Sequence, residues 1–316
     1  MIGIVGANGF IGRSLLDYYE DKHIPTIAYI RKRSAIDRFH FGALPKIREL
    51  TLGQAFDPKI FDGVDTLVLS VSATHPRTEG NSKEREMELN VVPHQRFIAS
   101  LLESDIQHVI YLSSGGAIYG TNETGIPISE TATPKPVTPY GYGKICTEEV
   151  LQKIWTGGGR RLTILRPSNP VGLHQRKSIN NHGLLPTVFE NIRNGKTIRV
   201  FGDGSTIKDY FAVEDLCGLI DKIAKVPPTK NLTLNVSSGV GQSITDIIRC
   251  ASIELKRPAR IHYRQSAQPK IHKNILSSQA ANTAFGWTAI SSVTDIFRRF
   301  NQKEKQIQRI QNLIDG

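Results

Sequence analysis

The chain has 316 residues, enough to bury a core in one large domain or two closely joined domains, and a formal net charge of +11 at pH 7. Because it shows no run of about 18 apolar residues, no signal-peptide pattern and no metal-ligand spacing of its three cysteines, we expect a cytoplasmic protein with no membrane span and no bound metal. The basic residues are dispersed rather than interleaved with aromatic residues in a stripe, which argues against a nucleic-acid partner.

Short apolar runs alternate with helical patterns in the first half of the chain. Strands are predicted at Ile2–Val5, Thr26–Ile30, Thr66–Ser72, His108–Ser113 and Leu162–Arg166, and helices at Ile11–Tyr19, Glu84–Glu103 and Tyr140–Trp155. Strands separated by helices favour parallel pairing with right-handed crossovers. The pattern therefore predicts an α/β fold with a doubly wound parallel Rossmann sheet.

After Pro167 the elements become shorter, and prolines and glycines become frequent. Helices are predicted at Leu184–Asn194, Val213–Ala224 and Ile244–Leu255, strands at Ile198–Phe201 and Leu232–Val236, and an amphipathic helix packed on the body at Val293–Ile314. We therefore predict a dinucleotide-binding Rossmann domain at residues 1–166 and a smaller C-terminal region at 167–316. Parts of 205–236 are expected to return to the Rossmann sheet.

A glycine-rich turn follows the first predicted strand directly and begins the first predicted helix. In turns of this kind the first glycine allows the tight turn, the second lets the backbone approach a pyrophosphate, and the third permits close helix packing. The helix N-terminus then offers N–H groups to the phosphates. We predict dinucleotide contacts along this turn from Gly6, Asn8, Gly9, Phe10, Ile11 and Gly12.

The end of the second predicted strand indicates which dinucleotide binds. An acidic residue there holds the ribose 2′-hydroxyl of NAD, whereas an arginine accommodates the 2′-phosphate of NADP. This chain has Arg31-Lys32-Arg33, and its next acidic residue is Asp37. Because guanidinium groups bind phosphate through two parallel hydrogen bonds, we predict NADP(H) with Arg31 and Arg33 as contacts, and NAD(H) as the alternative.

Tyr140 and Lys144 are four residues apart in a predicted helix and therefore share one face. A tyrosine with an ordinary pKa of about 10 is a poor base at neutral pH, but a nearby ammonium and an oxidised nicotinamide favour its phenolate. Such a pair can exchange a proton with a sugar oxygen while a hydride moves to or from carbon. We predict that Tyr140 and Lys144 are catalytic and also contact the cofactor.

Together, these motifs resemble the extended short-chain dehydrogenase/reductase family, particularly its nucleotide-sugar epimerases and reductases. The resemblance continues at Asn90-Val91, Ser113–Gly120, Leu165–Gly172, Phe201–Ser205, Lys208–Phe211, Asn235-Val236, Ser243-Ile244 and Gly286-Trp287. It implies that the C-terminal half binds a nucleoside-diphosphate sugar, that Asn169 contacts this substrate, and that the enzyme serves polysaccharide biosynthesis. It also implies a homodimer formed through the helices at Glu84–Glu103 and Tyr140–Trp155.

The chain departs from the family pattern at the catalytic hydroxyl. The family places a Ser or Thr four residues before its Tyr-Gly pair, and this position is Gly115 here. Ser114 is therefore predicted to bond the reacting oxygen of the substrate, with Ser113 as the alternative.

The expected phosphate contacts depart from the pattern as well. Lys208 stands where the family has an arginine, so the charge is kept but the bidentate fork is lost. The family's downstream pyrophosphate arginine has no aligned partner, and Arg264 or Lys270 is predicted to replace it. Arg176, on a polar loop after Asn169, is a further candidate phosphate ligand.

Two enzyme activities fit these residues, namely an NADP-dependent reductase of a 4-keto sugar and a nucleotide-sugar 4-epimerase of the UDP-hexose type. The basic residues after the second strand favour the reductase, because they suit a dissociable NADPH. A non-catalytic NADP-binding regulator is a third hypothesis. Gly115 supports it, whereas the presence of Tyr140 and Lys144 argues against it.

Overall fold

The computed structural model describes residues 1–31, 46–155, 157–175, 183–265 and 271–315. Its centre is a seven-stranded parallel sheet with strand order β10-β6-β5-β4-β1-β2-β3. In chain order these strands are β1 (Ile2–Val5), β2 (Thr26–Ile30), β3 (Lys46–Glu49), β4 (Thr66–Leu69), β5 (His108–Leu112), β6 (Arg161–Pro167) and β10 (Leu232–Val236). The predicted doubly wound Rossmann sheet is confirmed.

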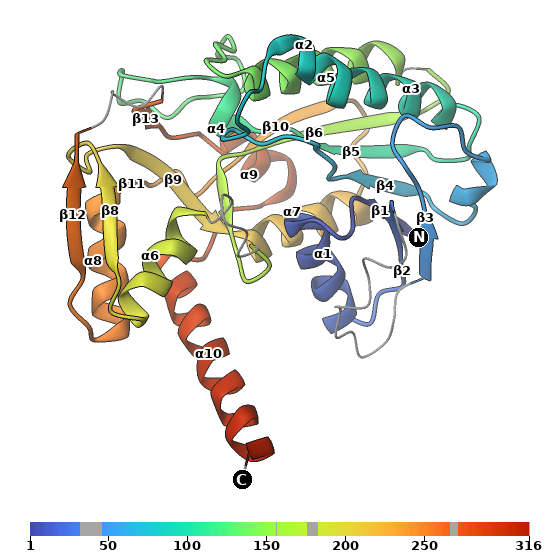
Figure 1. The fold of residues 1–316 in the computed structure, drawn as a ribbon. Coiled ribbons are helices and arrows are strands. Elements are labelled where there is room, and N and C mark those ends of the chain that lie inside the picture. The colour runs from blue at the N-terminus through green and yellow to red at the C-terminus, as the bar shows by residue number, and fades with distance from the viewer. Residues whose placement is uncertain (32–45, 156, 176–182, 266–270, 316) are drawn as a thin grey trace.

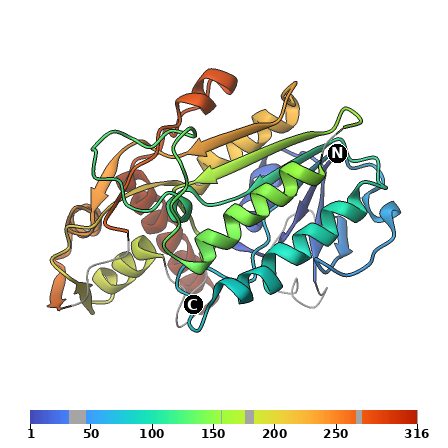
Figure 2. The same ribbon diagram turned by 90° about the horizontal axis from the view of Figure 1, so that it is seen from above.

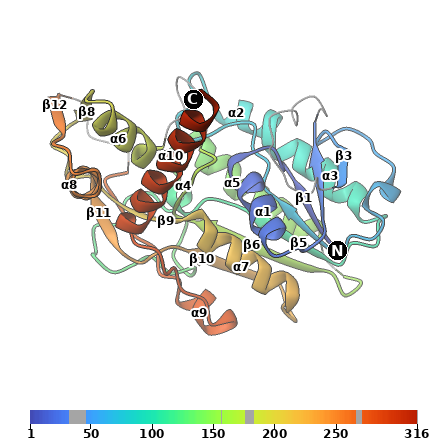
Figure 3. The same cartoon turned by 90° about the horizontal axis from the view of Figure 1, so that it is seen from below.

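One face of the sheet is covered by α1 (Phe10–Asp21) and α7 (Val213–Lys225), which lie side by side in Figure 3. Their apolar faces join the inner side chains of the sheet in one buried cluster. The short helix α9 (Gln279–Phe285) and the buried Trp287 belong to the same cluster. Residues from the last third of the chain therefore complete the core on this face of the central sheet.

The opposite face is covered by a continuous helical stretch and by α5 (Pro139–Ile154), which run next to each other in Figure 2. The stretch consists of α2 (Lys83–Glu86), the π-helical segment η3 (Met87–Val91) and α3 (Val92–Leu101). A second buried apolar cluster lies between these helices and the sheet. The predicted helix at Glu84–Glu103 is confirmed, but its π-helical middle was not foreseen.

The remaining elements form a smaller body beside the carboxyl ends of the central strands (Figure 1). Strand β9 (Ile207–Ala212) pairs with three short strands, and β8 (Thr197–Phe201) pairs with β12 (Arg260–Arg264). The partners of β9 are β7 (Asn169–Val171), β11 (Gly241–Ser243) and β13 (Lys273–Asn274). The helices of this body are α6 (Leu184–Arg193), α8 (Ile244–Leu255) and α10 (Val293–Asp315). The short helix α4 (Gly115–Ile118) contacts α5 and β6, and the 3-10 turn η2 (Pro58–Phe61) packs in the core of the central sheet.

The C-terminal helix α10 packs on the body only along its first half. Ile296, Phe297 and Phe300 are buried against α6 and α8, as the amphipathic pattern predicts. Farther along, Ile307 is 39% exposed, and Figure 1 shows the end of α10 projecting from the body. No helix in the described ranges combines the length and the apolar content that crossing a bilayer requires.

Candidate active site

The glycine turn between β1 and α1 has the geometry of a phosphate-binding turn. Gly6 has a φ of +82°, and its N–H donates to the carbonyl of Tyr29 on β2 at 3.1 Å. A Cβ atom at Gly12 would lie 2.3 Å from the Gly6 carbonyl oxygen, so only glycine fits there. Helix α1 begins after Gly9 with neither a side-chain cap nor an acidic residue in its first turn. Its leading N–H groups therefore suit an anionic ligand.

The other predicted residues of the cofactor turn divide into two kinds. Phe10 and Ile11 pack their side chains on the apolar core, so the backbone is what they present to a ligand. Asn8 is half-buried on the turn.

Arg31 is exposed directly after β2, at the same sheet edge as the turn, because β1 and β2 pair in parallel. Arg33 lies outside the described residues.

Tyr140 lies in the first turn of α5, which the Thr138 side chain caps by accepting from the Gly141 N–H at 3.1 Å. Lys144, one turn later, is buried and donates from Nζ to the Leu112 carbonyl at 2.8 Å. Its Nζ lies 5.7 Å from the centre of the Tyr140 ring. Burial lowers the pKa of Lys144 to about 8, against the opposing effect of nearby carboxylates. The structure thus brings the predicted pair together.

The pKa of Tyr140 moves in the direction opposite to the one expected. Burial raises it to about 12, while a hydrogen bond with Ser114 lowers it and the charge of Glu86 raises it further. In the protein alone, desolvation penalises the phenolate more than its neighbours stabilise it, and the preference expected beside an oxidised nicotinamide stays a prediction. At neutral pH Tyr140 therefore carries its proton in the protein alone.

The two adjacent serines have different partners. Ser114 is half-buried, its side chain makes no capping bond to α4, and its hydroxyl lies close enough to Tyr140 to lower the pKa of that phenol. Ser113 is buried and donates to a Glu148 carboxylate oxygen. A Cβ atom at Gly115 would lie 2.4 Å from Leu276 Cδ1 and 2.7 Å from the Arg166 carbonyl oxygen. The backbone leaves no room for a side chain at Gly115, and Ser114 supplies the hydroxyl beside Tyr140 instead.

A buried polar network lies next to Lys144 on α5. Glu148, one turn after Lys144 on α5, is paired with Arg166 of β6. Arg166 also donates to the Tyr119 hydroxyl at 2.7 Å, and this hydroxyl donates to Asn235 Oδ1 on β10 at 2.9 Å. Sequence reasoning missed Glu148, although its spacing of four residues from Lys144 places it on the same helix face.

The predicted substrate residues form a looser group. Asn169 is half-buried and donates from Nδ2 to the Asp209 carbonyl at 2.8 Å, so this side chain also joins β7 to β9. Burial lowers the pKa of Lys208 on β9, and the positive charge of Arg77 lowers it further. Arg77 belongs to the loop after β4, so two segments far apart in the sequence bring cations near each other. Sequence reasoning missed Arg77, because the position of its loop depends on tertiary contacts.

Other predicted phosphate contacts are farther along the chain. Arg264 is exposed at the end of β12, opposite Phe201 of β8. Arg176 and Lys270 lie outside the described residues.

Asp209 is fully buried and accepts from the N–H groups of Ser238 and Gly239, both at 2.9 Å. It therefore holds the turn after β10 to β9.

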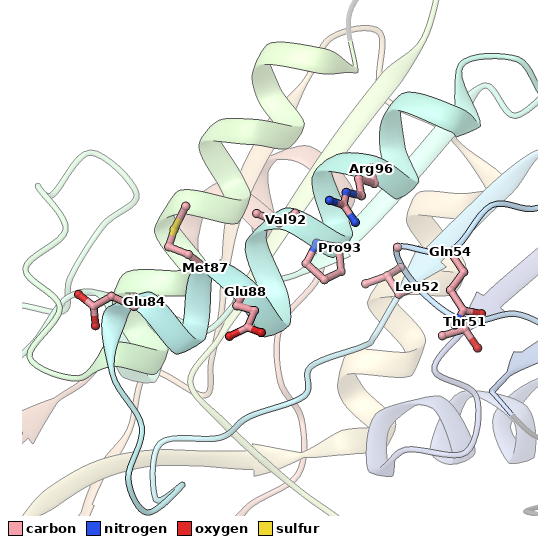
Figure 4. A pocket seen from close by; sticks show the side chains of 10 residues that line it. Thr51, Leu52, Gln54, Glu84, Met87, Glu88, Val92, Pro93 and Arg96 are labelled. Carbon is pink, nitrogen blue, oxygen red and sulfur yellow. The ribbon is translucent and has the colours of Figure 1, made fainter.

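A pocket of about 670 Å³ lies between the loop after β3 and the helical stretch α2–η3–α3 (Figure 4). Leu52 and Gln54 line it from the loop, and Pro93 and Arg96 line it from α3. Neither Tyr140 nor Lys144 lines this pocket. The same helical stretch presents Met87 and Glu88 to the pocket and buries Glu86 and Asn90.

The chain matches the family described as the NAD dependent epimerase/dehydratase family over residues 2–236. It is 24% identical over 297 residues to dTDP-4-dehydro-6-deoxyglucose reductase from Escherichia coli, covering 90% of this chain and 91% of the relative. It is also 24% identical over 321 residues to UDP-glucose 4-epimerase from Mycolicibacterium smegmatis, covering 95% and 99%. The solved UDP-glucose 4-epimerase of Thermotoga maritima has a TM-score of 0.82 at 22% identity, covering 94% of this chain and 96% of that one, and thus shares the fold.

Proposed function

Because the chain belongs to the NAD dependent epimerase/dehydratase family, we propose that it is an enzyme that moves a hydride between a nicotinamide dinucleotide and a nucleoside-diphosphate sugar. The observation that carries this proposal is the grouping of Ser114, Tyr140 and Lys144. Relatives that match it along almost their whole length include a dTDP-4-dehydro-6-deoxyglucose reductase and a UDP-glucose 4-epimerase. Both activities transfer a hydride at C4 of a sugar.

The reaction that we favour is the reduction of a 4-keto group. A nicotinamide dinucleotide held by the turn from Gly6 to Gly12 would supply the hydride for the carbonyl carbon. Tyr140 gives its proton to the carbonyl oxygen, so a hydroxyl forms and Tyr140 is left as a phenolate. Ser114 bonds the same oxygen, and the charge of Lys144 stabilises the phenolate until it takes a proton from solvent.

The substrate docks from the C-terminal body in this proposal. Asn169 and Lys208 hold the diphosphate, with Arg264 as a further basic contact. The glycine turn fits the cofactor pyrophosphate, because α1 presents uncapped N–H groups there and the backbone at Gly12 excludes a side chain.

A 4-epimerase is the second candidate, supported by the similarity to UDP-glucose 4-epimerase over 95% of this chain. Purified protein incubated with 4-keto-6-deoxy nucleotide sugars and NADPH is expected to oxidise NADPH in proportion to the sugar reduced. An epimerase would instead interconvert UDP-hexoses without net oxidation of the cofactor. The Tyr140→Phe variant is the control, and its rate should fall by about 10²–10⁴-fold. Absence of both activities with all these substrates would overturn the proposal.

We propose NADP(H) as the preferred cofactor of this NAD-dependent family member, because Arg31 lies exposed beside the glycine turn. Charge-assisted hydrogen bonds to a phosphate contribute about 1.5–3 kcal/mol, so Arg31→Ala should weaken NADP binding by about tenfold or more. NAD binding should change little. Arg298→Ala, which removes an exposed arginine of α10, is the matched control. Tighter binding of NAD than of NADP by the wild-type protein would contradict this proposal.

We also propose a homodimer formed through α3 and α5, which lie next to each other on the outer face of the sheet (Figure 2). Leu89, in the helical stretch that leads into α3, is 37% exposed there. Sedimentation equilibrium should give twice the chain mass, and Leu89→Arg should shift it toward the monomer. A monomeric wild-type protein would refute the dimer.

A further inference from the structure

The ammonium of Lys144 is buried at the end of β5. Lys144 is 7% exposed, and within the described part of the chain its Nζ donates a single hydrogen bond, to the carbonyl of Leu112 at 2.8 Å. An ammonium has three N–H donors, and burial removes the water that would otherwise satisfy them. The groups that stabilise this charge must therefore come from the surrounding protein.

Two buried carboxylates lie near Lys144, but other donors occupy both of them. Glu148 is paired with Arg166. Glu86, at the end of α2, accepts hydrogen bonds from three polar side chains, those of Thr74, Asn81 and Asn90. Both carboxylates act on Lys144 through their charge rather than through a hydrogen bond to its Nζ. The direct contacts of the ammonium are of another kind.

Two tyrosine rings flank the ammonium. The Nζ atom lies over the ring of Tyr111 of β5, 4.9 Å from its centre, and over the ring of Tyr140, 5.7 Å from its centre. Both distances suit a cation–π interaction, in which the negative face of an aromatic ring attracts a cation within about 6 Å. This attraction is stronger where water is excluded. Tyr111 is the nearer of the two rings, and the reaction proposed above makes no use of it.

The ring of Tyr111 is held firmly in place. Tyr111 is 1% exposed and belongs to the apolar cluster between the sheet and the helices α3 and α5. Its backbone pairs with Leu69 of β4 and Ile164 of β6. Its ring meets the His94 ring of α3 edge to face, with centres 5.6 Å apart and planes at 76°. A ring fixed on three sides in this way keeps one face toward Lys144.

The titratable groups around Lys144 leave the rings neutral at neutral pH. Burial raises the pKa of Tyr111 and of Tyr140, so each contributes its ring face and not a charge. Burial lowers the pKa of His94 to about 4, so this imidazole is neutral as well. Burial also lowers the pKa of Lys144 to about 8, and the two carboxylates oppose this effect. Contacts that favour the charged ammonium therefore matter close to neutral pH.

We propose that Tyr111 is a positioning residue whose ring face holds the charged ammonium of Lys144 beside Tyr140. Tyr111 acts through Lys144 and not on the reacting atoms. Its part in turnover rests on the catalytic role proposed for Lys144. The contact itself is present without substrate, so it can be tested on the free protein.

The test measures the protonation of Lys144 by competitive acetylation over a pH series, followed for each lysine by peptide mass spectrometry. Only the neutral amine reacts, and the ring attracts the charged form, so removing the ring lowers the pKa of Lys144. Tyr111→Leu and Tyr111→Met should therefore move the midpoint of Lys144 acetylation about one pH unit lower. Tyr111→Phe keeps the ring face and should titrate close to the wild type.

Two comparisons separate the ring face from packing and from burial. A fluorinated phenylalanine at position 111 keeps the shape of the ring but weakens its negative face, so its midpoint should fall below that of Tyr111→Phe. The exposed Lys83 has its Nζ 4.8 Å from the ring centre of Tyr142. Tyr142→Leu should move the acetylation midpoint of Lys83 by about half a unit or less, because exposed cation–π contacts are weaker.

A Lys144 midpoint that is the same in Tyr111→Phe, in the fluorinated variant and in Tyr111→Leu would overturn the proposal. Kinetics give a second readout once a substrate is found. The alkaline limb of kcat/KM should move to lower pH in Tyr111→Leu and return in Tyr111→Phe, whereas a purely structural role would lower kcat/KM equally at every pH. If the acetylation midpoint falls but no nucleotide sugar reacts, the proposed reaction fails while the contact of Tyr111 with Lys144 stands.

Discussion

Arg166 of β6 forms an ion pair with the carboxylate of Glu148 on α5. Its Nε donates to both carboxylate oxygens at 3.1 Å, and its Nη2 donates to Oε2 at 2.5 Å. Both side chains are buried. Because Glu148 belongs to α5, the helix that carries Tyr140 and Lys144, this ion pair fixes α5 to the central sheet. Asn235 extends the same network to β10 through the Tyr119 hydroxyl.

Replacing Glu148 with alanine should cost about 3–5 kcal/mol of unfolding free energy, because it leaves the Arg166 charge buried without its partner. Urea unfolding measures this loss. Arg249→Ala is the matched control, since its pair with Asp246 has side chains 70% and 42% exposed. That pair should contribute less than about 1 kcal/mol. Equal losses in the two variants would contradict this role for the buried pair.

Replacing Ser114 should affect mainly turnover, whereas replacing Ser113 should affect mainly the free energy of unfolding. Ser114→Ala removes the hydroxyl next to Tyr140, so kcat should fall by about 10²-fold while the unfolding free energy stays near that of the wild type. Ser113→Ala removes a donor to the buried Glu148 and should cost about 1–3 kcal/mol. Turnover assays and urea unfolding on both variants check this. The reverse pattern would assign the catalytic hydroxyl to Ser113.

Gly115 should tolerate no side chain. Gly115→Ala places a Cβ against the Arg166 carbonyl oxygen and Leu276, and such overpacking should cost about 1–3 kcal/mol. Gly218→Ala, in α7, is the control, because the nearest atom to its added Cβ is the Tyr18 hydroxyl at 3.7 Å. This change should be neutral or stabilise by up to about 1 kcal/mol. If Gly115→Ala were as stable as the control, the steric explanation of this glycine would fail.

Two buried histidines should make the protein less stable in mild acid. Burial lowers the pKa of both His94 and His108 from the ordinary value of 6.5 to about 4. The unfolded chain therefore binds protons in a range where the folded chain does not, so stability is complete above pH 6.5 and is lost as the pH falls toward 4. Each histidine should remove about 1.4 kcal/mol per pH unit within this range.

Urea unfolding at about pH 7, 6 and 5 measures this slope. His108→Gln should reduce this slope by the contribution of one histidine. In the wild type the imidazole Nε2 lies 2.9 Å from Thr163 Oγ1, and the glutamine amide keeps a hydrogen bond to this hydroxyl. A slope that is unchanged in this variant would show that His108 already titrates normally in the folded protein.

The sequence predicted the first β-turn-α unit almost to the residue. The strand is a continuous apolar run, and the glycine spacing indicates a tight turn that leads directly into a helix. Strand β3 was missed because Lys46–Glu49 lies at the sheet edge and has no buried residue. The short strands around β9 were missed for a related reason. They are held by pairing between distant segments, and their own sequences carry no alternating apolar pattern.

Within the site, Tyr140 and Lys144 could be found because helical spacing places them on one face. Glu86 could not, since Lys83-Glu84-Arg85-Glu86 reads as a solvated charged stretch. Its burial depends on the π-helical turn that follows and on donors from the loop after β4. The choice between Ser113 and Ser114 likewise depended on where Glu148 lies in three dimensions.

The position of β10 at the edge of the central sheet also sets the order in which the chain can fold during its synthesis. Residues 1–167 contain six of the seven central strands, but β6 keeps an unpaired edge until Leu232–Val236 emerge. Unpaired edges of buried strands invite pairing with other chains. A nascent chain that pauses between these two points should therefore expose this sheet edge, and the last third of the protein supplies the strand that covers it.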